Sequence, residues 1–102
     1  MSAHRTNIPN SLNEHWMPFS ANRDFKKNPR LIIEAKGVYL KTHEGKTLID
    51  ASSGLFCNPL GHGREEIVEA VAKQLRELDF VLPFNQGFGG SFELATRIAK
   101  HT

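Results

Sequence analysis

Residues 51–63, with the sequence ASSGLFCNPLGHG, combine a nucleophile and a base with residues that form tight turns. Cys57, the one cysteine of the chain, stands five positions before His62, with Pro59 and Gly61 between them. A Cys–His pair can act as nucleophile and general base, but such partners usually lie far apart in sequence. The stretch therefore favours a small buried thiol and a loop histidine bonded to the backbone.

Other motifs in the chain come close to known chemistry without matching it. Residues 52–54 do not form the G-x-S-x-G nucleophile elbow. The sequence GFGGSF at 87–92 resembles a phosphate loop before a helix, but Phe92 stands where the dinucleotide fingerprint needs glycine, and no lysine follows. No histidine has a partner at metal-ligand spacing; the histidines are His4, His15, His43, His62 and His101. The residues alone predict no catalytic group and no metal site.

The elements around residues 51–63 begin with a sheet. An apolar run at Leu31–Ile33 precedes a hairpin predicted over Val38–Thr42 and Thr47–Asp50. The four-residue tip of this hairpin contains Gly45, which can adopt the positive φ that such tips often need. We therefore expect a meander of two or three short antiparallel strands.

Two helices are expected after residue 63. Arg64–Leu78 has an apolar stripe at helical spacing, formed by Ile67, Val71, Leu75 and Leu78. A glycine-rich loop over 79–90 follows, and Ser91 is then the predicted N-cap of a second amphipathic helix. The predicted fold class is α+β, a small antiparallel β-meander plus two helices, with the proportions of one edge of a larger body.

Composition restricts the class of protein. The chain has 102 residues, with 24% charged, 39% hydrophobic and a net charge of +2, which is typical of a soluble globular protein. Charges of both signs are interspersed, which argues against a nucleic-acid partner. A lone cysteine cannot form an intrachain disulfide, and no apolar run is long enough for a transmembrane helix. We expect no membrane association and a cytoplasmic location.

The N-terminal residues divide into an arm and an aromatic segment. Residues 1–13 are predicted to be a flexible arm that precedes the folded part, residues 14–102. Residues 15–25, which include Trp16 and Phe19, gather aromatic side chains in a stretch broken by proline. We favour an arm clamped on the protein's own core. The alternative is an arm that lines a pocket or reaches a partner subunit.

The order of motifs resembles the N-terminal part of class III aminotransferases, which are fold-type I enzymes that use pyridoxal 5′-phosphate. The motifs that carry the resemblance are Gly45, Leu48–Asp50, Ser53–Leu55, Gly61–His62 and Glu65–Ile67. The flanking sequences, HWMPFSANRDFKKNPRLI and LDFVLPFNQGFGGSFELATRIA, look like the β-alanine/ω-amino acid:pyruvate branch. The resemblance covers roughly residues 14–102.

The resemblance implies roles for three aromatic residues. Phe19 and Phe56 match positions that line the substrate pocket, and Phe84 matches an aromatic residue near an active site formed at a dimer interface. The partners implied are a small-molecule amino donor, a keto-acid acceptor and a second copy in a homodimer or higher homo-oligomer. The implied cofactor is pyridoxal 5′-phosphate.

The resemblance also implies what this chain does not contain. Three features of the family lie downstream of the segment that this chain resembles. They are the cofactor-phosphate loop, the aspartate at the pyridine nitrogen and the Schiff-base lysine. The chain's lysines at 36, 41, 46, 73 and 100 do not match the catalytic lysine, so we expect no catalytic residue, no cofactor-binding residue and no activity for the chain alone. The alternatives are another class III branch, such as taurine or diamine aminotransferases or the related aminomutases, and a non-catalytic truncated fragment that mediates interaction or dimerisation.

Overall fold

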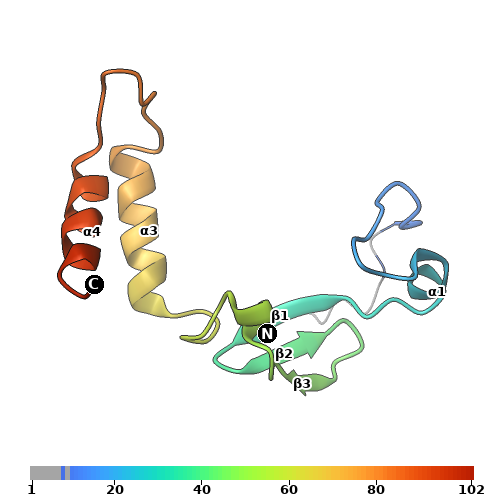
Figure 1. Ribbon diagram of the computed structural model, residues 1–102. Coiled ribbons are helices and arrows are strands. Elements are labelled where there is room, and N and C mark those ends of the chain that lie inside the picture. Colours follow the sequence, from blue (N-terminus) through green and yellow to red (C-terminus); the bar gives the residue numbers. More distant parts are fainter. Residues whose placement is uncertain (1–7, 9) are drawn as a thin grey trace. The chain divides into compact units, whose positions relative to one another are not determined.

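A three-stranded antiparallel sheet forms the centre of the first part of the chain in the computed structural model (Figure 1). The structure describes residue 8 and residues 10–102, so most of the predicted arm, residues 1–7 and 9, lies outside the described residues. Two compact units are present, the first ending at Glu65 and the second beginning at Glu66. The elements are α1 (Asn22–Lys27), β1 (Ile32–Lys36), β2 (Tyr39–Thr42), β3 (Thr47–Ile49), α2 (Ser53–Phe56), α3 (Glu65–Glu77) and α4 (Gly89–Ala99).

The sheet confirms the predicted meander. Strand order is β1-β2-β3, and Leu40 in the central strand pairs with Ala35 on one side and Leu48 on the other. In the hairpin tip Gly45 has φ +84°, and its amide donates to the Thr42 carbonyl at 2.9 Å. Glycine carries no steric penalty at positive φ, so this residue allows the tight reversal between β2 and β3.

Helix α3 lies within the predicted range, whereas α4 begins earlier than predicted. The N-cap of α4 is Phe88, with extended backbone at φ −110°, and the helix starts at Gly89. Ser91 is therefore not the N-cap, and its hydroxyl donates to the Phe88 carbonyl at 2.7 Å. The prediction was wrong because Gly89 and Gly90 adopt helical backbone and extend the first turn before the serine.

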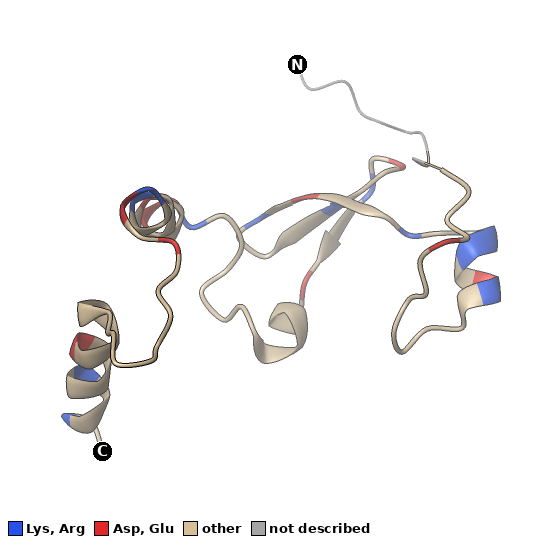
Figure 2. Ribbon diagram, turned by 90° about the horizontal axis from the view of Figure 1, so that it is seen from above, with Lys and Arg blue, Asp and Glu red and all other residues tan. Residues whose placement is uncertain are grey.

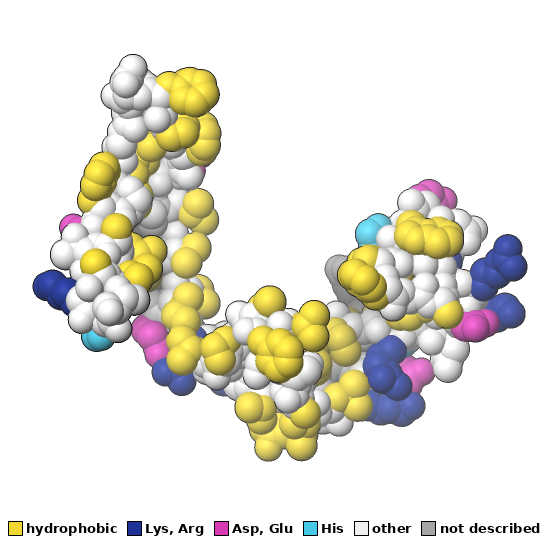
Figure 3. Space-filling model, viewed as in Figure 1, with side chains coloured by type: hydrophobic (Ala, Val, Ile, Leu, Met, Phe, Trp, Pro, Cys, Tyr) yellow, Lys and Arg dark blue, Asp and Glu magenta, His cyan; other side chains and the backbone are white. Residues whose placement is uncertain are grey.

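The described part of the chain has no apolar core of its own. Apart from Pro29, no apolar side chain is buried there, and the buried polar residues are Asn22, Thr42 and His43. Hydrophobic side chains instead lie along the surface of α3 (Figure 3), including Val71 and Leu75, which are more than half exposed. Within the second unit, no Cα atom of α3 lies within 8 Å of a Cα atom of α4. The chain thus presents apolar faces without the packing that would cover them.

Two expectations about burial were wrong. Trp16 and Phe19 are exposed, by 78% and 109%, so the aromatic segment is not clamped on a core of this chain. A short helix, α1, follows these residues and overlaps the end of the stretch described as broken by proline. Cys57 is also exposed, although a buried thiol was predicted. In each case the described chain offers no apolar interior to receive the side chain.

Charged residues of both signs occur together on the helices (Figure 2). On α1, Asp24 in the first turn and Lys26 and Lys27 in the last turn complement the helix dipole. On α3, Lys73 and Glu77 form an exposed ion pair at 3.9 Å. Among the described helices, none is both long and apolar enough to cross a membrane.

Candidate functional site

The loop after β3 has an unusual backbone. Helix α2 is one distorted turn, and its four residues, Ser53, Gly54, Leu55 and Phe56, all have φ between +51° and +65°. This region of backbone space is unfavourable for residues with a Cβ atom, and three of the four have one. Such a run needs contacts that hold it in place.

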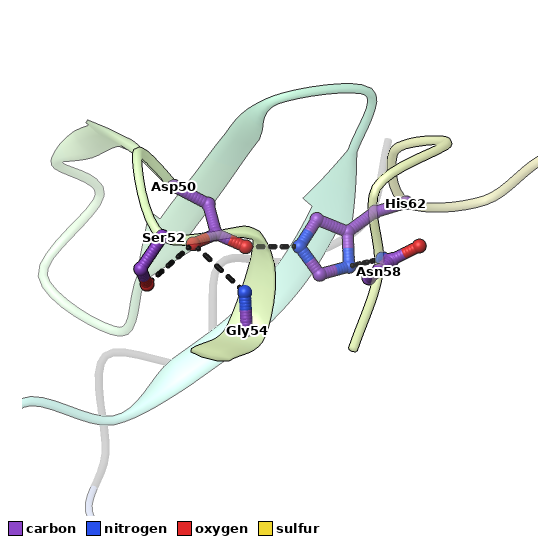
Figure 4. Close-up of polar contacts among 5 residues, drawn as sticks. All are labelled: Asp50, Ser52, Gly54, Asn58 and His62. Atoms are coloured by element: carbon purple, nitrogen blue, oxygen red, sulfur yellow. Dashed lines mark hydrogen bonds and ion pairs between the residues drawn. The ribbon is translucent and has the colours of Figure 1, made fainter. Parts of the chain in front are cut away.

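Asp50, the residue directly after β3, supplies the first of these contacts (Figure 4). Its Oδ1 accepts hydrogen bonds from the Gly54 amide at 3.1 Å and from the Ser52 hydroxyl at 3.2 Å. Its Oδ2 lies 2.8 Å from Nε2 of His62. The Asp50 side chain is only 8% exposed. One carboxylate therefore binds both the start of the loop and its far end.

His62 is held on both sides of its ring and through its backbone. The side-chain amide nitrogen of Asn58, Nδ2, lies 2.8 Å from Nδ1 of His62. Because an amide nitrogen only donates, Nδ1 is the acceptor of this bond. The ring hydrogen is therefore on Nε2, and Asp50 accepts it. The backbone of His62 exchanges two hydrogen bonds with Gly37, at 2.8 and 2.9 Å. We call Asp50, His62 and their partners Ser52, Gly54 and Asn58 the Asp50–His62 clasp.

The clasp affects the titration of the carboxylate. The hydrogen bond from His62, followed by that from the Gly54 amide, lowers the pKa of Asp50 below its ordinary value of 3.8. Both bonds favour the charged form of the carboxylate over the neutral form. Asp50 is therefore an acceptor at neutral pH, and it does not act as a proton donor there.

The geometry does not support a Cys–His pair. The Cys57 thiol donates to the Leu55 carbonyl at 3.5 Å, and both ring nitrogens of His62 are already bonded to Asn58 and Asp50. The structure thus gives the histidine a side-chain partner that the sequence did not predict. In the described residues no group of three or more metal-ligating side chains is present.

Phe56 and Phe19 are both displayed on turns that polar residues fix. Phe56 is 83% exposed at the end of α2. Phe19, at φ +49°, lies in a turn held by the buried Asn22, whose side chain accepts from the Met17 amide and donates to the carbonyls of Met17 and Ser20. The sequence predicted the aromatic residues but not the polar side chains that hold their turns.

Phe84 lies in the loop between α3 and α4 and is 74% exposed. It belongs to the second unit, whereas Phe19 and Phe56 belong to the first. Within the first unit, no Cα atom of α1 lies within 8 Å of a Cα atom of α2. The three predicted pocket residues are therefore all exposed, two of them in the first unit and one in the second.

Two hollows of the first unit lie away from these aromatics. A cavity of about 510 Å³ beside the hairpin tip is lined by residues that include Arg30, His43 and Lys46. A second, of about 340 Å³, lies between the described end of the arm and α1, with Met17 and Phe25 in its wall. Neither is lined by a predicted substrate residue.

Comparison with known proteins identifies the family. The sequence model of class III aminotransferases matches residues 20–100. The chain belongs to the class III aminotransferases. This aminotransferase chain is 49% identical over 89 residues to the β-alanine–pyruvate aminotransferase of Pseudomonas aeruginosa, covering 87% of the chain and 20% of that relative. It is 47% identical over 91 residues to the ω-amino acid–pyruvate aminotransferase of Pseudomonas putida, covering 89% and 20%.

Solved structures of the family share its fold. The (S)-enantioselective ω-transaminase from Thermomicrobium roseum matches with a TM-score of 0.78 and 31% identity, over 84% of this chain and 20% of that one. The ω-transaminase from Pseudomonas jessenii in complex with PMP matches with a TM-score of 0.79 and 26% identity, over 86% and 20%. The aminotransferase chain therefore spans about one fifth of the length of the proteins it matches.

Proposed function

We propose that this chain is the N-terminal part of an aminotransferase that moves an amino group from a β-alanine-like ω-amino acid or amine to pyruvate. The observation that carries this proposal is that sequence identity is higher to members of this branch than to members of another branch of the family. Identity is 49% and 47% to relatives that use β-alanine or ω-amino acids with pyruvate, over 87% and 89% of the chain. It falls to 35% over 62% of the chain for an adenosylmethionine-8-amino-7-oxononanoate aminotransferase of the same family.

A second branch has support of its own. The putrescine–pyruvate aminotransferase of Pseudomonas aeruginosa is 41% identical over 87% of the chain. It shares the keto-acid acceptor and differs in the amino donor, a diamine instead of an amino acid. The candidate functions are therefore separated by the donor alone.

The proposed cofactor is pyridoxal 5′-phosphate, which supplies an electron sink when it is bound. The described residues do not fit it. At the start of α4, where a phosphate could meet backbone amides, the Phe88 ring fills the space beside Gly90, and the Ser91 hydroxyl is bonded to the Phe88 carbonyl. We therefore assign the cofactor to parts of the enzyme outside this chain.

The chain's own contribution is the wall of the substrate site. Phe19, Phe56 and Phe84 are proposed to contact the apolar part of the amino donor and to exclude water from it. Their exposure in the described chain supports this, because exposed aromatic side chains that lie apart from a core are available to a ligand or to another part of the protein.

We further propose a homodimer or higher homo-oligomer in the cytoplasm, with residues 14–102 in the aminotransferase fold and residues 1–13 as an arm before it. The apolar stripe of α3 supports burial against more protein, because it is uncovered in the described chain. Within residues 1–102 there is no second cysteine to form a disulfide with Cys57, which supports a reducing compartment for this part of the protein.

The test uses the complete product of the gene, purified and loaded with pyridoxal 5′-phosphate. Alanine formed from pyruvate is measured with β-alanine and with putrescine as donors. Higher kcat/KM with β-alanine supports the proposed branch, higher kcat/KM with putrescine supports the second, and no alanine with either overturns both. Residues 1–102 alone, mixed with pyridoxal 5′-phosphate and then dialysed, should retain no absorbance of the cofactor. A band that persists after dialysis would contradict the assignment of the cofactor to other parts of the enzyme.

A further inference from the structure

The loop that displays Phe56 depends on few contacts with the rest of the molecule. Within the first unit, no Cα atom of α2 lies within 8 Å of a Cα atom of another helix or strand. Backbone hydrogen bonds close the loop on itself, among them those from the Phe56 amide to the Ser52 carbonyl and from the Asn58 amide to the Ser53 carbonyl. These bonds shape the turn but do not attach it to the sheet. The attachment comes from the clasp and from the pairing of His62 with Gly37.

The clasp binds the loop at two places with one carboxylate. Oδ1 of Asp50 holds the Gly54 amide, which lies between two non-glycine residues at positive φ. Oδ2 holds His62, whose backbone is fixed to the sheet through Gly37. Both distances, 3.1 and 2.8 Å, are within normal hydrogen-bond range, and a charged acceptor strengthens them.

We propose that Asp50 and His62 are positioning residues for the amino-donor site, because together they hold residues 53–56 in the conformation that presents Phe56. This proposal rests on the proposed function and deepens it. Neither residue needs to touch the donor. Each acts through Phe56, since the backbone conformation that they stabilise sets the direction of the aromatic ring.

The proposal predicts how donor binding changes when the clasp is removed. His62→Ala takes away the ring and its bonds to Asp50 and Asn58, while the backbone pairing with Gly37 can persist. A displaced Phe56 weakens binding of the donor in ground and transition states alike, which raises KM and leaves kcat nearly unchanged. We expect KM for an aromatic amine donor to rise about tenfold, and KM for pyruvate to stay constant.

The deciding experiment is a double-mutant cycle in the complete, cofactor-loaded gene product. His62→Ala, Phe56→Ala and the double variant are compared by kcat and KM for 1-phenylethylamine. If His62 acts through Phe56, His62→Ala adds little once Phe56 is already alanine. Additive effects overturn the proposal, as does an unchanged KM for the amine in His62→Ala.

Three further variants separate positioning from simple loss of stability. Asp50→Asn keeps an oxygen for the Gly54 amide but loses the charge, so its rise in KM should be smaller than that of Asp50→Ala. Glu44→Ala removes the hairpin-tip pair with Lys46, at 2.7 Å in the same unit, and should leave KM unchanged. Equal effects of Asp50→Asn and Glu44→Ala overturn the proposal. An unmutated product without transaminase activity overturns the proposed function instead, and this proposal with it.

Discussion

Asp50 Oδ2 and His62 Nε2 lie 2.8 Å apart, although the two residues are twelve positions apart in sequence. The contact joins the end of β3 to the far end of the loop that contains α2. Because His62 also pairs with Gly37 through its backbone, the loop is bound to two parts of the sheet. Under the positioning proposal, the placement of Phe56 thus depends on a carboxylate that is 8% exposed and an imidazole that is 24% exposed.

The carboxylate of Asp50 should titrate below its ordinary pKa of 3.8, because His62 and the Gly54 amide donate to its charged form. A group whose pKa is lower when folded contributes stability above its unfolded pKa, and that contribution is lost as the pH falls through the folded value. The clasp should therefore be intact at neutral pH and be lost only in acid. The measurement is a ¹³C NMR titration of the Asp50 carboxyl carbon in the folded protein.

Substitution provides the control for this titration. His62→Ala should move the Asp50 midpoint up towards 3.8, because the bond from His62 is the largest cause of the lowered pKa. Lys46→Ala, which removes the exposed pair with Glu44, should leave the midpoint where it is. A midpoint in the unmutated protein at or above 3.8 would show that the clasp does not form in solution.

Gly61→Ala should loosen the far end of the loop. Gly61 has φ +89°, and a Cβ atom there would lie 3.2 Å from the Gly37 carbonyl oxygen, against backbone that already pairs with His62. The left-handed backbone costs about 1–2 kcal/mol for a residue with a Cβ atom. Hydrogen exchange of the Gly37 and His62 amides should become about 5–30 times faster.

The matched control for this substitution is Gly89→Ala. Gly89 lies in the first turn of α4, and nothing lies within 4 Å of the Cβ it would gain. Alanine is more favourable than glycine in a helix by about 1 kcal/mol. The Gly89→Ala variant should therefore keep α4 or slightly raise its stability. Equal exchange rates in Gly61→Ala and the unmutated protein would argue that Gly61 is not confined to positive φ.

Much of the fold was predictable because its signals are local. The alternation around Gly45 predicted the hairpin, and the stripe from Ile67 to Leu78 predicted α3, since both patterns depend on neighbours along the chain. The start of α4 was mispredicted because serine is one of the residue types that are favoured at the N-cap, which pointed to Ser91. The residue types alone do not show that Gly89 and Gly90 already belong to the helix. Burial was mispredicted for Trp16 and Cys57 because a core is a property of tertiary packing.

The clasp was less predictable, for a physical reason. The sequence shows Asp50 and His62 as parts of family motifs, but their contact requires a strand end, a turn at positive φ and a bridge to Gly37. No single periodicity encodes that combination. The glycines of residues 51–63 were the available signal, because they mark where the chain turns sharply enough to bring the two side chains together.

Asn22 should be as important for the Phe19 turn as the clasp is for Phe56. Its buried amide group accepts from the Met17 amide at 2.7 Å and donates to the carbonyls of Met17 and Ser20 at 2.9 and 3.1 Å. Asn22→Ala leaves these groups without partners and should cost about 1–3 kcal/mol of local stability. The check is faster hydrogen exchange of the Met17 amide, with exposed Asn13→Ala as a control that should not change it.

The apolar stripe of α3 should make residues 1–102 associate when they are produced alone. Val71 and Leu75 are 53% and 59% exposed, and the free energy of burying apolar surface is about 25 cal/mol per Å², so contact with a second apolar face is favourable. The double variant Val71→Gln, Leu75→Gln should shift the sedimentation coefficient towards that of a monomer. Both substitutions remove apolar surface, and glutamine is a good helix former, so the helix is kept. Glu69→Gln with Lys73→Gln, on the same helix, is the control and should leave association unchanged. A monomer of the unmutated chain with one sharp, cooperative melt would contradict this prediction, because cooperative unfolding requires a packed interior and the described residues contain none.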